Sequence, residues 1–317
     1  MRESLPFGNF SDTNVSLETI LATPDDAEFG FFVVVDLEYP EELHNQHNDY
    51  PLAPEHLNVT TEMLSPSQAR EKCESGETFK LLQTFNTKEY YVCHYRILKF
   101  YATHGLIVSK VHRIIKFRQS KWMKSYIDIN TEIRRKAKTD CLKDLGKLLN
   151  NSVFGKSMED LTNRQNIKLF TKDYQCGKLI SKPNFKSFTI FHPDLCALIM
   201  GKSIVTWNKP TYIGATVLDL SKLVMYKFLY ETIKPTYGDK AKLLYSDTDS
   251  LLLAIETEDL YSDFQKIRDE FDFSDYPNDH PLHCTKNKKV VLNMKDELNG
   301  AIISEYVGLR AKMYSIQ

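Results

Sequence analysis

The sequence lacks the features of a membrane protein and of a secreted protein. Its 317 residues contain no apolar run near the roughly 18–20 residues that a membrane-spanning helix needs. The first ten residues, MRESLPFGNF, do not follow the charged-then-apolar order of a signal peptide. We therefore expect an intracellular protein of the nucleus or cytoplasm, neither secreted nor attached to a membrane.

Closely paired cysteines are also lacking. No two of the six cysteines have the CxxC spacing of a zinc or redox site. They are Cys73, Cys93, Cys141, Cys176, Cys196 and Cys284. Scattered cysteines favour a reduced compartment, where thiols stay free.

The chain has almost no net charge, yet its charge is unevenly distributed. The formal net charge is −1, but the segment from Lys110 to Lys147 holds twelve basic and four acidic residues, a local excess of eight positive charges. A segment this basic can bind a phosphate backbone by releasing counterions. The same pattern is typical of a solvated helix face, so composition leaves both interpretations open.

Strand and helix patterns both occur, in an order that predicts an α+β protein. Residues 1–30 look rich in loops, and residues 89–105 fit a strand or a helix. Strands are expected at 30–36, 106–117, 166–171 and 187–191, as a hairpin over 242–256, and as a strand, turn, strand, strand series over 289–316. Helices are expected at 65–75, twice within 120–160, within 208–238 and at 259–270.

Caps and periodicity support three of these helices. Ser65 and Pro66 suit the start of the first, and Thr139 with Asp140 suits the start of the second helix within 120–160. The helix within 208–238 has an apolar stripe, made by Val217, Leu220, Val224 and Phe228.

Two aspartates, Asp247 and Asp249, stand inside the otherwise apolar hairpin "KLLYSDTDSLLLAIE". Carboxylates on either side of one residue repel each other and resist losing water, so a bound cation would stabilise them. Mg²⁺ prefers such oxygen ligands and keeps coordination sites for substrate phosphates. Ser-Asp-Thr-Asp is also ordinary turn chemistry, and spacing alone does not exclude that interpretation.

Three motifs together resemble signatures of family B DNA polymerases. "YSDTDS" at 245–250 is similar to YGDTDS, with Ser246 in place of glycine. "KLLNNSVFG" at 147–155 resembles the signature of a lysine followed by Asn-Ser-x-Tyr-Gly, with Phe154 in place of tyrosine. Lys312-Met313-Tyr314 matches a third signature, Lys-x-Tyr. The flanking segments resemble the protein-primed polymerases of Polinton-type transposons and their viral relatives.

The resemblance implies a fold and an activity. The fold would be a partial palm, an antiparallel sheet with helices, with a helical fingers insertion. Residues 1–118 would be palm-associated, 119–165 would form the fingers and 166–317 the rest of the palm. The activity would be DNA-directed DNA polymerase, acting on a DNA primer-template and dNTPs with two Mg²⁺ ions, in DNA replication. A terminal priming protein is a further expected partner.

The resemblance also implies residue roles. Asp249 would be the main metal ligand and catalytic residue, and Asp247 its partner. Lys147 would meet the triphosphate of the incoming nucleotide, with Arg135 as a second cation. The sugar and base would lie near Asn151, Phe154 and Gly155, and the primer strand near Lys312 and Tyr314. Taken singly, each residue also has a simpler interpretation: Lys147 could be an ordinary exposed charge, and Phe154 an ordinary core residue. Lys143, Lys147 and Asn151 are spaced to share one helical face.

One expected signature, Asp-x-x-Ser-Leu-Tyr-Pro, is not found. Asp36 in "VVVDLEYPEE" is the most similar position. In the pattern of the protein-primed polymerases, Met1 would lie just beyond the missing aspartate. The upstream exonuclease and most of a thumb are missing as well. We therefore expect low or no polymerase activity from this chain, as in a truncated gene model or a decayed transposon copy.

Other functions explain fewer of these residues. A non-catalytic nucleic-acid-binding remnant would keep the basic segment without needing the aspartates. A reverse transcriptase has adjacent acids in Tyr-x-Asp-Asp, whereas Thr248 separates them here. We expect His44 and His47 at the surface rather than on a metal, and Trp122 and Trp207 in packing rather than stacked on bases.

Overall fold

The computed structural model describes residues 1–72, 79–310 and 312–317. The fold is mixed α+β, as the sequence predicts. The chain divides into two compact units, with Met1–Tyr126 and Thr216–Gln317 in unit 1 and Ile127–Ala215 in unit 2. The motifs predict three functional segments, which are defined by role. The two compact units are defined by contacts, so they do not test that prediction.

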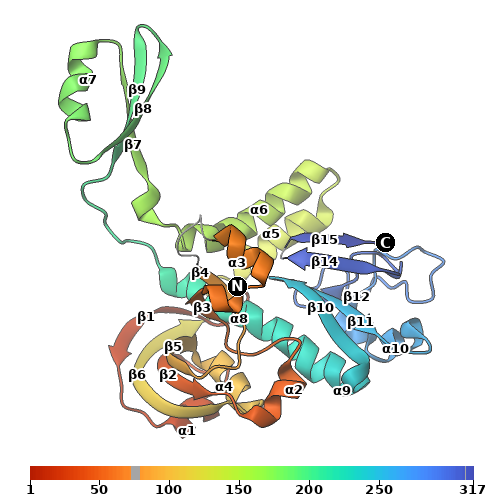
Figure 1. Cartoon of the computed structure of the whole chain (residues 1–317). Coiled ribbons are helices and arrows are strands. Elements are labelled where there is room, and N and C mark those ends of the chain that lie inside the picture. Colours follow the sequence, from red (N-terminus) through yellow and green to blue (C-terminus); the bar gives the residue numbers. More distant parts are fainter. Residues whose placement is uncertain (73–78, 311) are drawn as a thin grey trace. The chain divides into compact units, whose positions relative to one another are not determined.

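A four-stranded antiparallel sheet begins unit 1, with strand order β1-β6-β2-β5 (Figure 1). Its strands are β1 (Leu5–Asp12), β2 (Phe29–Glu38), β5 (Lys88–His94) and β6 (Ile107–Ser120). On β2, Val33 and Val35 are fully buried while Phe32 and Val34 between them are only half-buried, the alternation of a strand with one core face. The loop-rich expectation for residues 1–30 is wrong in part, because pairing with the distant β6 makes residues 5–12 a strand.

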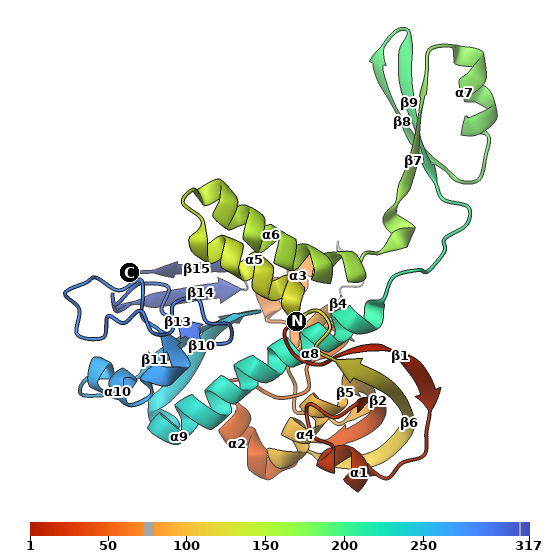
Figure 2. The ribbon, with the colours of Figure 1, turned by 180° about the vertical axis from the view of Figure 1, so that it is seen from behind.

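Helices α1 (Leu17–Ala22) and α4 (Tyr95–Thr103) complete this part of unit 1 (Figure 2). The ambiguous segment 89–105 is both a strand and a helix: β5 ends at His94, whose Nδ1 accepts a hydrogen bond from the Arg96 amide and so caps α4. Four α4 residues are at most 1% exposed, namely Tyr95, Ile97, Leu98 and Tyr101. Burial of this helix face supplies much of the core.

An insertion between β2 and β5 contains short elements. They are η1 (Glu41–Leu43), α2 (His44–His47), β3 (Glu55–Asn58), η2 (Thr61–Met63), α3 (Pro66–Lys72) and β4 (Phe79–Leu82). Helix α3 starts at Pro66 with Ser65 as its cap, as predicted, and the rest of the expected helix lies outside the described residues. A buried ion pair, Lys88 Nζ to Glu55 Oε1 at 2.8 Å, ties the insertion to β5.

A long helical segment begins at the end of unit 2 and continues into unit 1. There it joins a second apolar core, made by Phe228, Leu229, Ile233, Tyr237, Ala241, Phe271, Phe273, Tyr276 and Leu282. Helix α8 (Thr211–Lys227) runs into a π-helical turn, η4 (Phe228–Ile233), and then into α9 (Lys234–Tyr237) and η5 (Gly238–Lys240). The expected single apolar stripe is incomplete, because Leu223, Met225 and Tyr226 are buried as well. The helix is therefore covered on more than one side, which a single stripe does not predict.

Strands β10 (Ala241–Asp247) and β11 (Ser250–Ile255) form the predicted hairpin. The remaining elements are α10 (Leu260–Lys266), η6 (Arg268–Glu270), β12 (Phe271–Asp272), β13 (Met294–Lys295), β14 (Tyr306–Arg310) and β15 (Met313–Ile316). The first strand expected in 289–316 is wrong: β13 has two residues, since positive φ angles at Lys289 and Leu292 interrupt the extended backbone. The predicted helix at 259–270 is shortened to α10 and one 3-10 turn.

Unit 2 contains most of α5 (Lys124–Lys136) and all of α6 (Asp140–Ser157), the two helices predicted within 120–160. Thr139 caps α6 by accepting a hydrogen bond from the Leu142 amide. Gly146 allows close packing of the pair, because a Cβ there would lie 3.0 Å from the Asn130 carbonyl oxygen.

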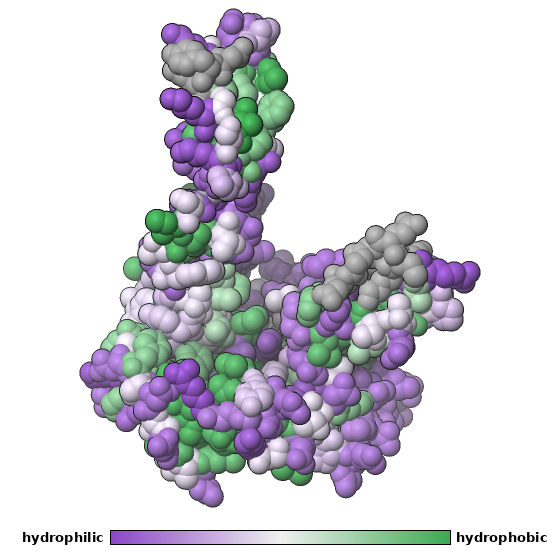
Figure 3. Space-filling model, turned by 60° about the vertical axis from the view of Figure 1, so that its left-hand side comes forward, coloured by the Kyte–Doolittle hydropathy of each residue, from purple (hydrophilic) through white to green (hydrophobic). Residues whose placement is uncertain are grey.

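The rest of unit 2 is η3 (Leu161–Asn163), β7 (Gln165–Phe170), α7 (Asp173–Ile180), β8 (Phe185–His192) and β9 (Leu195–Gly201), with sheet order β7-β9-β8. The expected strands at 166–171 and 187–191 are confirmed, whereas β9 and α7 were not predicted. Several large apolar side chains of this sheet are exposed, and Figure 3 shows such green side chains among purple ones. Trp207 is 66% exposed, and Trp122 of unit 1 is 45% exposed, so the packing predicted for both is wrong.

No helix within the described ranges is both long and apolar enough to cross a membrane. Five cysteines lie in those ranges, and each is a free thiol.

Candidate active site

The aspartate pair lies at the tip of the β10–β11 hairpin. Asp247 ends β10, and it pairs with Ser250 at the start of β11. Between them Thr248 has a φ of 58°, and the Asp249 amide donates to the Asp247 carbonyl oxygen at 2.6 Å. A β-branched residue with a positive φ is strained, so the turn is held in place by its surroundings.

A second hairpin, β14–β15, brings the Lys-Met-Tyr signature to this tip. The Lys312 ammonium lies 2.7 Å from Asp247 Oδ2, and the Lys312 amide donates to the Tyr245 hydroxyl at 3.2 Å. The rings of Tyr245 and Tyr314 are 4.9 Å apart between centroids. Two of the three sequence signatures therefore meet within unit 1.

Electrostatics at the tip follow from this ion pair. The hydrogen bond from Lys312 lowers the pKa of the Asp247 carboxyl, and the same contact raises the pKa of Lys312. Both side chains are open to solvent, at 36% and 76% exposure. An exposed ion pair contributes little free energy, so the Lys312 ammonium can leave Asp247 and bind another anion at low cost.

The donor set at the tip fits one hard cation. Asp247 and Asp249 offer carboxylate oxygens, and Mg²⁺ is commonly held by one or two carboxylates, with water and substrate phosphates completing its shell. Within the described ranges, no three His, Cys, Asp or Glu side chains are grouped so as to hold a metal. Two ions would therefore need further ligands beyond this pair.

Asp36, the residue most similar to the aspartate of the missing signature, forms hydrogen bonds within its own sheet. Its Oδ1 accepts hydrogen bonds from the Tyr90 amide at 2.8 Å and from His112 Nε2 at 2.7 Å. These two bonds, with the Tyr90 bond the larger effect, lower the pKa of Asp36. Its carboxylate is thus engaged by two neighbours within the sheet.

The lysine-asparagine signature lies on α6 in unit 2. Lys143, Lys147 and Asn151 are one turn apart on this helix, so they share the predicted face. Lys147 and Asn151 are exposed, whereas Phe154 is half-buried. A Cβ added at Gly155 would meet nothing within 4 Å, so this side of the helix is open.

Arg135 is exposed near the end of α5 and pairs with Glu132 at 2.8 Å. It is therefore paired within its own helix. The nucleotide-binding roles of Lys147, Asn151, Phe154, Gly155 and Arg135 stay predictions.

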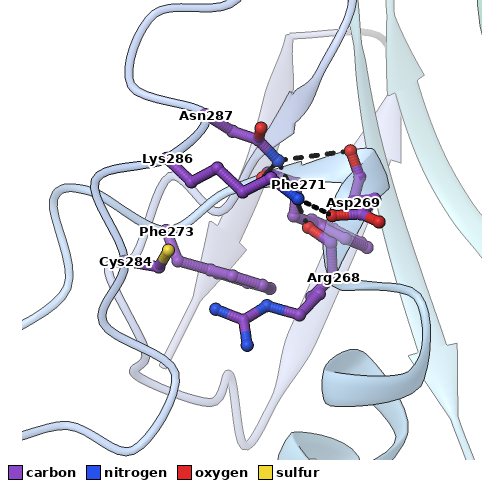
Figure 4. Close-up of a pocket in the computed structure, with 7 residues that line it drawn as sticks. All are labelled: Arg268, Asp269, Phe271, Phe273, Cys284, Lys286 and Asn287. Atoms are coloured by element: carbon purple, nitrogen blue, oxygen red, sulfur yellow. Dashed lines mark hydrogen bonds and ion pairs between the residues drawn. The ribbon is translucent and has the colours of Figure 1, made fainter.

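Neither of two hollows coincides with the signatures. The hollow in Figure 4, lined by Arg268, Asp269, Phe271, Phe273, Cys284, Lys286 and Asn287, has a volume of about 10 Å³. That is room for one water molecule and not for a nucleotide. A shallow groove of unit 2 is lined by Asp128, Ile129, Glu132, Ile133, Lys136, Ala137 and Leu142, so it contains none of the signature residues.

His47 contradicts the expectation of a surface histidine. It is 4% exposed, and its Nδ1 lies 2.7 Å from the Tyr39 hydroxyl. Burial is the main reason that the pKa of His47 falls to about 4. The side chain is a neutral hydrogen-bonding partner in the core, and its spacing from His44 comes from the short helix α2.

The residues next to His47 include two that sequence reasoning did not single out. Asp49 accepts a hydrogen bond from the amide of Leu243 on β10, and Tyr50 is half-buried against the second apolar core of unit 1. Only the fold places them beside the hairpin, because about 190 residues separate the partners.

Comparison with known proteins gives distant similarities. No protein-family model matches the chain. Uncharacterized protein 075R of Invertebrate iridescent virus 3 is 27% identical over 121 residues, which are 35% of this chain and 67% of that protein.

Among solved structures, Phi29 DNA polymerase complexed with primer-template DNA is similar over 86% of this chain, with a TM-score of 0.47 and 15% identity. The ternary complex of the same polymerase with incoming nucleotide substrates has a TM-score of 0.47 and 16% identity over 85% of this chain. The chain spans 38% of the length of the polymerase in either structure.

Proposed function

We propose that this chain is part of a protein-primed family B DNA polymerase. Its residues would serve templated transfer of a nucleoside monophosphate from a dNTP to a primer 3′-hydroxyl, with release of pyrophosphate. The observation that carries the proposal is the contact between Lys312 and Asp247, 65 residues apart in sequence and 2.7 Å apart in space. The two residues belong to separate polymerase signatures, and a chance match predicts no such contact.

The chain's own residues would divide the work as follows. Asp247 and Asp249 would hold Mg²⁺, which when bound would stabilise negative charge on the triphosphate and the attacking oxygen. The Lys147 ammonium would neutralise the triphosphate, and Arg135 would add a second positive charge. Asn151, Phe154 and Gly155 would border the sugar and base.

Lys312 and Tyr314 would hold the primer strand. Because the Lys312 ammonium is exposed, it can move from Asp247 to a primer phosphate when DNA binds. The Asp247 oxygen that it leaves then becomes available to a cation. By itself we expect the chain to extend primers slowly or not at all, since two ions need more ligands than Asp247 and Asp249 supply.

Binding, rather than extension, therefore tests the proposal best. A labelled primer-template ending in a dideoxynucleotide is titrated with the chain in Mg²⁺, with and without the next complementary dNTP, and anisotropy is recorded. We expect the complementary dNTP to tighten DNA binding severalfold, and Lys147→Ala or Asp249→Asn to remove this gain. Lys138→Ala, which removes another exposed lysine of the basic segment, should keep it.

The second candidate function is non-catalytic nucleic-acid binding, which is favoured by the exposure of Arg134, Arg135, Lys136 and Lys147 on α5 and α6. It predicts salt-dependent DNA binding that ignores the dNTP. That result in the wild-type chain would overturn the polymerase proposal.

A further inference from the structure

The outer edge of β10 is held by a segment from far earlier in the chain. Oδ2 of Asp49 accepts hydrogen bonds from the Leu243 amide and from the Lys234 ammonium, each at 3.2 Å. The same ammonium donates to the carbonyl oxygen of Ala241, the first residue of β10, at 3.1 Å. One carboxylate and one ammonium thus fix two points on the backbone of the strand that carries Asp247.

The point of attachment is next to a β-bulge. Leu243 pairs with Leu253, but Tyr245 pairs with Leu252, so Leu244 is an extra residue on β10. An extra residue exchanges the two faces for every position that follows it in the strand. The bulge therefore decides which side of the hairpin presents Tyr245 and Asp247, and Asp49 binds the last residue before it.

The next residue, Tyr50, anchors the segment that carries Asp49. Its carbonyl oxygen accepts a hydrogen bond from the Tyr230 hydroxyl at 2.8 Å, and its ring lies 4.8 Å from that of Tyr226. Asp49 is therefore held against β10 by a fixed piece of backbone.

We propose that Asp49 is a positioning residue, which holds the bulge of β10 so that the carboxylates at the tip are presented in one geometry. This inference builds on the proposed function, since it concerns how the chain aims its metal-binding carboxylates. Asp49 does not touch the reacting groups. Its effect passes through the backbone of β10, at the Leu243 amide.

Amide hydrogen exchange without metal tests the support itself. In Asp49→Ala we expect the amides of residues 243–249 to exchange at least tenfold faster, whereas amides of β9 in unit 2 keep their rates. Asp49→Asn keeps an acceptor for the Leu243 amide and should restore part of the protection. Unchanged exchange at 243–249 in Asp49→Ala would overturn the inference.

Mn²⁺ binding, followed by the electron paramagnetic resonance signal of the free ion, tests the consequence. Asp247→Asn defines the binding that depends on the tip. We expect Asp49→Ala to weaken that binding about fivefold and Asp49→Asn, which keeps an acceptor for the Leu243 amide, to weaken it less. An affinity in Asp49→Ala equal to that of the wild-type chain would refute the positioning role.

The two proposals fail in different ways. If the wild-type chain binds no Mn²⁺ through Asp247, while Asp49→Ala still accelerates exchange, the positioning role stands and the polymerase proposal falls. If Asp247-dependent binding is present but Asp49→Ala changes neither exchange nor affinity, the positioning role falls alone.

Discussion

Phe117 of unit 1 and Phe188 of unit 2 both lie in antiparallel sheets, but their surroundings differ. Phe117 on β6 is fully buried, and its ring lies 4.8 Å from that of Phe32. Phe188 on β8 is 55% exposed. Unit 1 therefore draws its stability from a closed apolar core, whereas the sheet of unit 2 leaves apolar side chains in solvent.

Truncating these two residues should give the largest contrast. Phe117→Ala removes a buried ring and leaves a cavity, so we expect a loss of about 4 kcal/mol in the free energy of unfolding. Phe188→Ala should change it by about 0.5 kcal/mol or less, because the site is already solvated. Urea unfolding followed by circular dichroism measures both, and equal losses would contradict the comparison.

Breaking an ion pair should also cost more stability in unit 1 than in unit 2. Lys88 of unit 1 is 1% exposed, and Lys88→Met removes the ammonium that pairs with Glu55 and leaves, among the described residues, only the Thr84 hydroxyl on this carboxylate, at a cost of about 2 kcal/mol. Glu159 of unit 2 meets Lys156, Arg164 and Lys209, but water reaches its carboxylate and can replace them. Glu159→Gln should therefore shift the urea midpoint less than Lys88→Met; a reversed order would show that the unit 2 network is the stronger one.

Acid should destabilise unit 1 through His94. This side chain is fully buried, and burial is the largest cause of the fall in its pKa from 6.5 to about 3. Below pH 6.5 His94 is protonated in the unfolded chain but stays neutral in the folded chain. Its contribution therefore lowers the free energy of unfolding by about 1.4 kcal/mol per pH unit, until about pH 3.

Unfolding free energies between pH 7 and pH 4 check this slope. His94→Gln should roughly halve it, because the lowered pKa of buried His47 adds a similar slope down to about pH 4, whereas His192→Gln, at an exposed position of unit 2, should leave it unchanged. An undiminished slope in His94→Gln would assign the acid sensitivity to groups other than His94.

The smallest effect is expected at the hairpin tip, where unit 1 opens to solvent. Lys312→Met should raise the pKa of Asp247 back toward 3.8, because the hydrogen bond that lowers it is lost. Any stability from this pair is complete above pH 3.8 and is lost as the pH falls through the lower folded value. Carbon-13 NMR of the Asp247 carboxyl measures the shift, Lys242→Met is the matched control, and an unchanged pKa in Lys312→Met would show that the ion pair does not persist in solution.

Much of the fold was predictable where structure is local. The start of α6 at Thr139 and the hairpin of residues 242–256 follow from caps, periodicity and turn chemistry. Strand β1 was missed because its pairing with β6 involves partners about 100 residues away, and no short window reports them. His47 was misplaced because distant residues pack on it: the ring of Tyr230 lies 4.8 Å from its own, although its hydrogen-bond partner Tyr39 is only eight residues away.

By itself the sequence determined which chemical groups the signatures carry and that Lys147 and Asn151 share a helical face, because helix periodicity depends on residues a few positions apart. Only the tertiary structure decided that Lys312 meets Asp247, that Asp49 holds β10, and that Lys88 is buried on Glu55. The physical reason is range: hydrogen bonds and caps within an element depend on neighbours in sequence, whereas ion pairs and burial between elements depend on which distant surfaces the whole chain packs together.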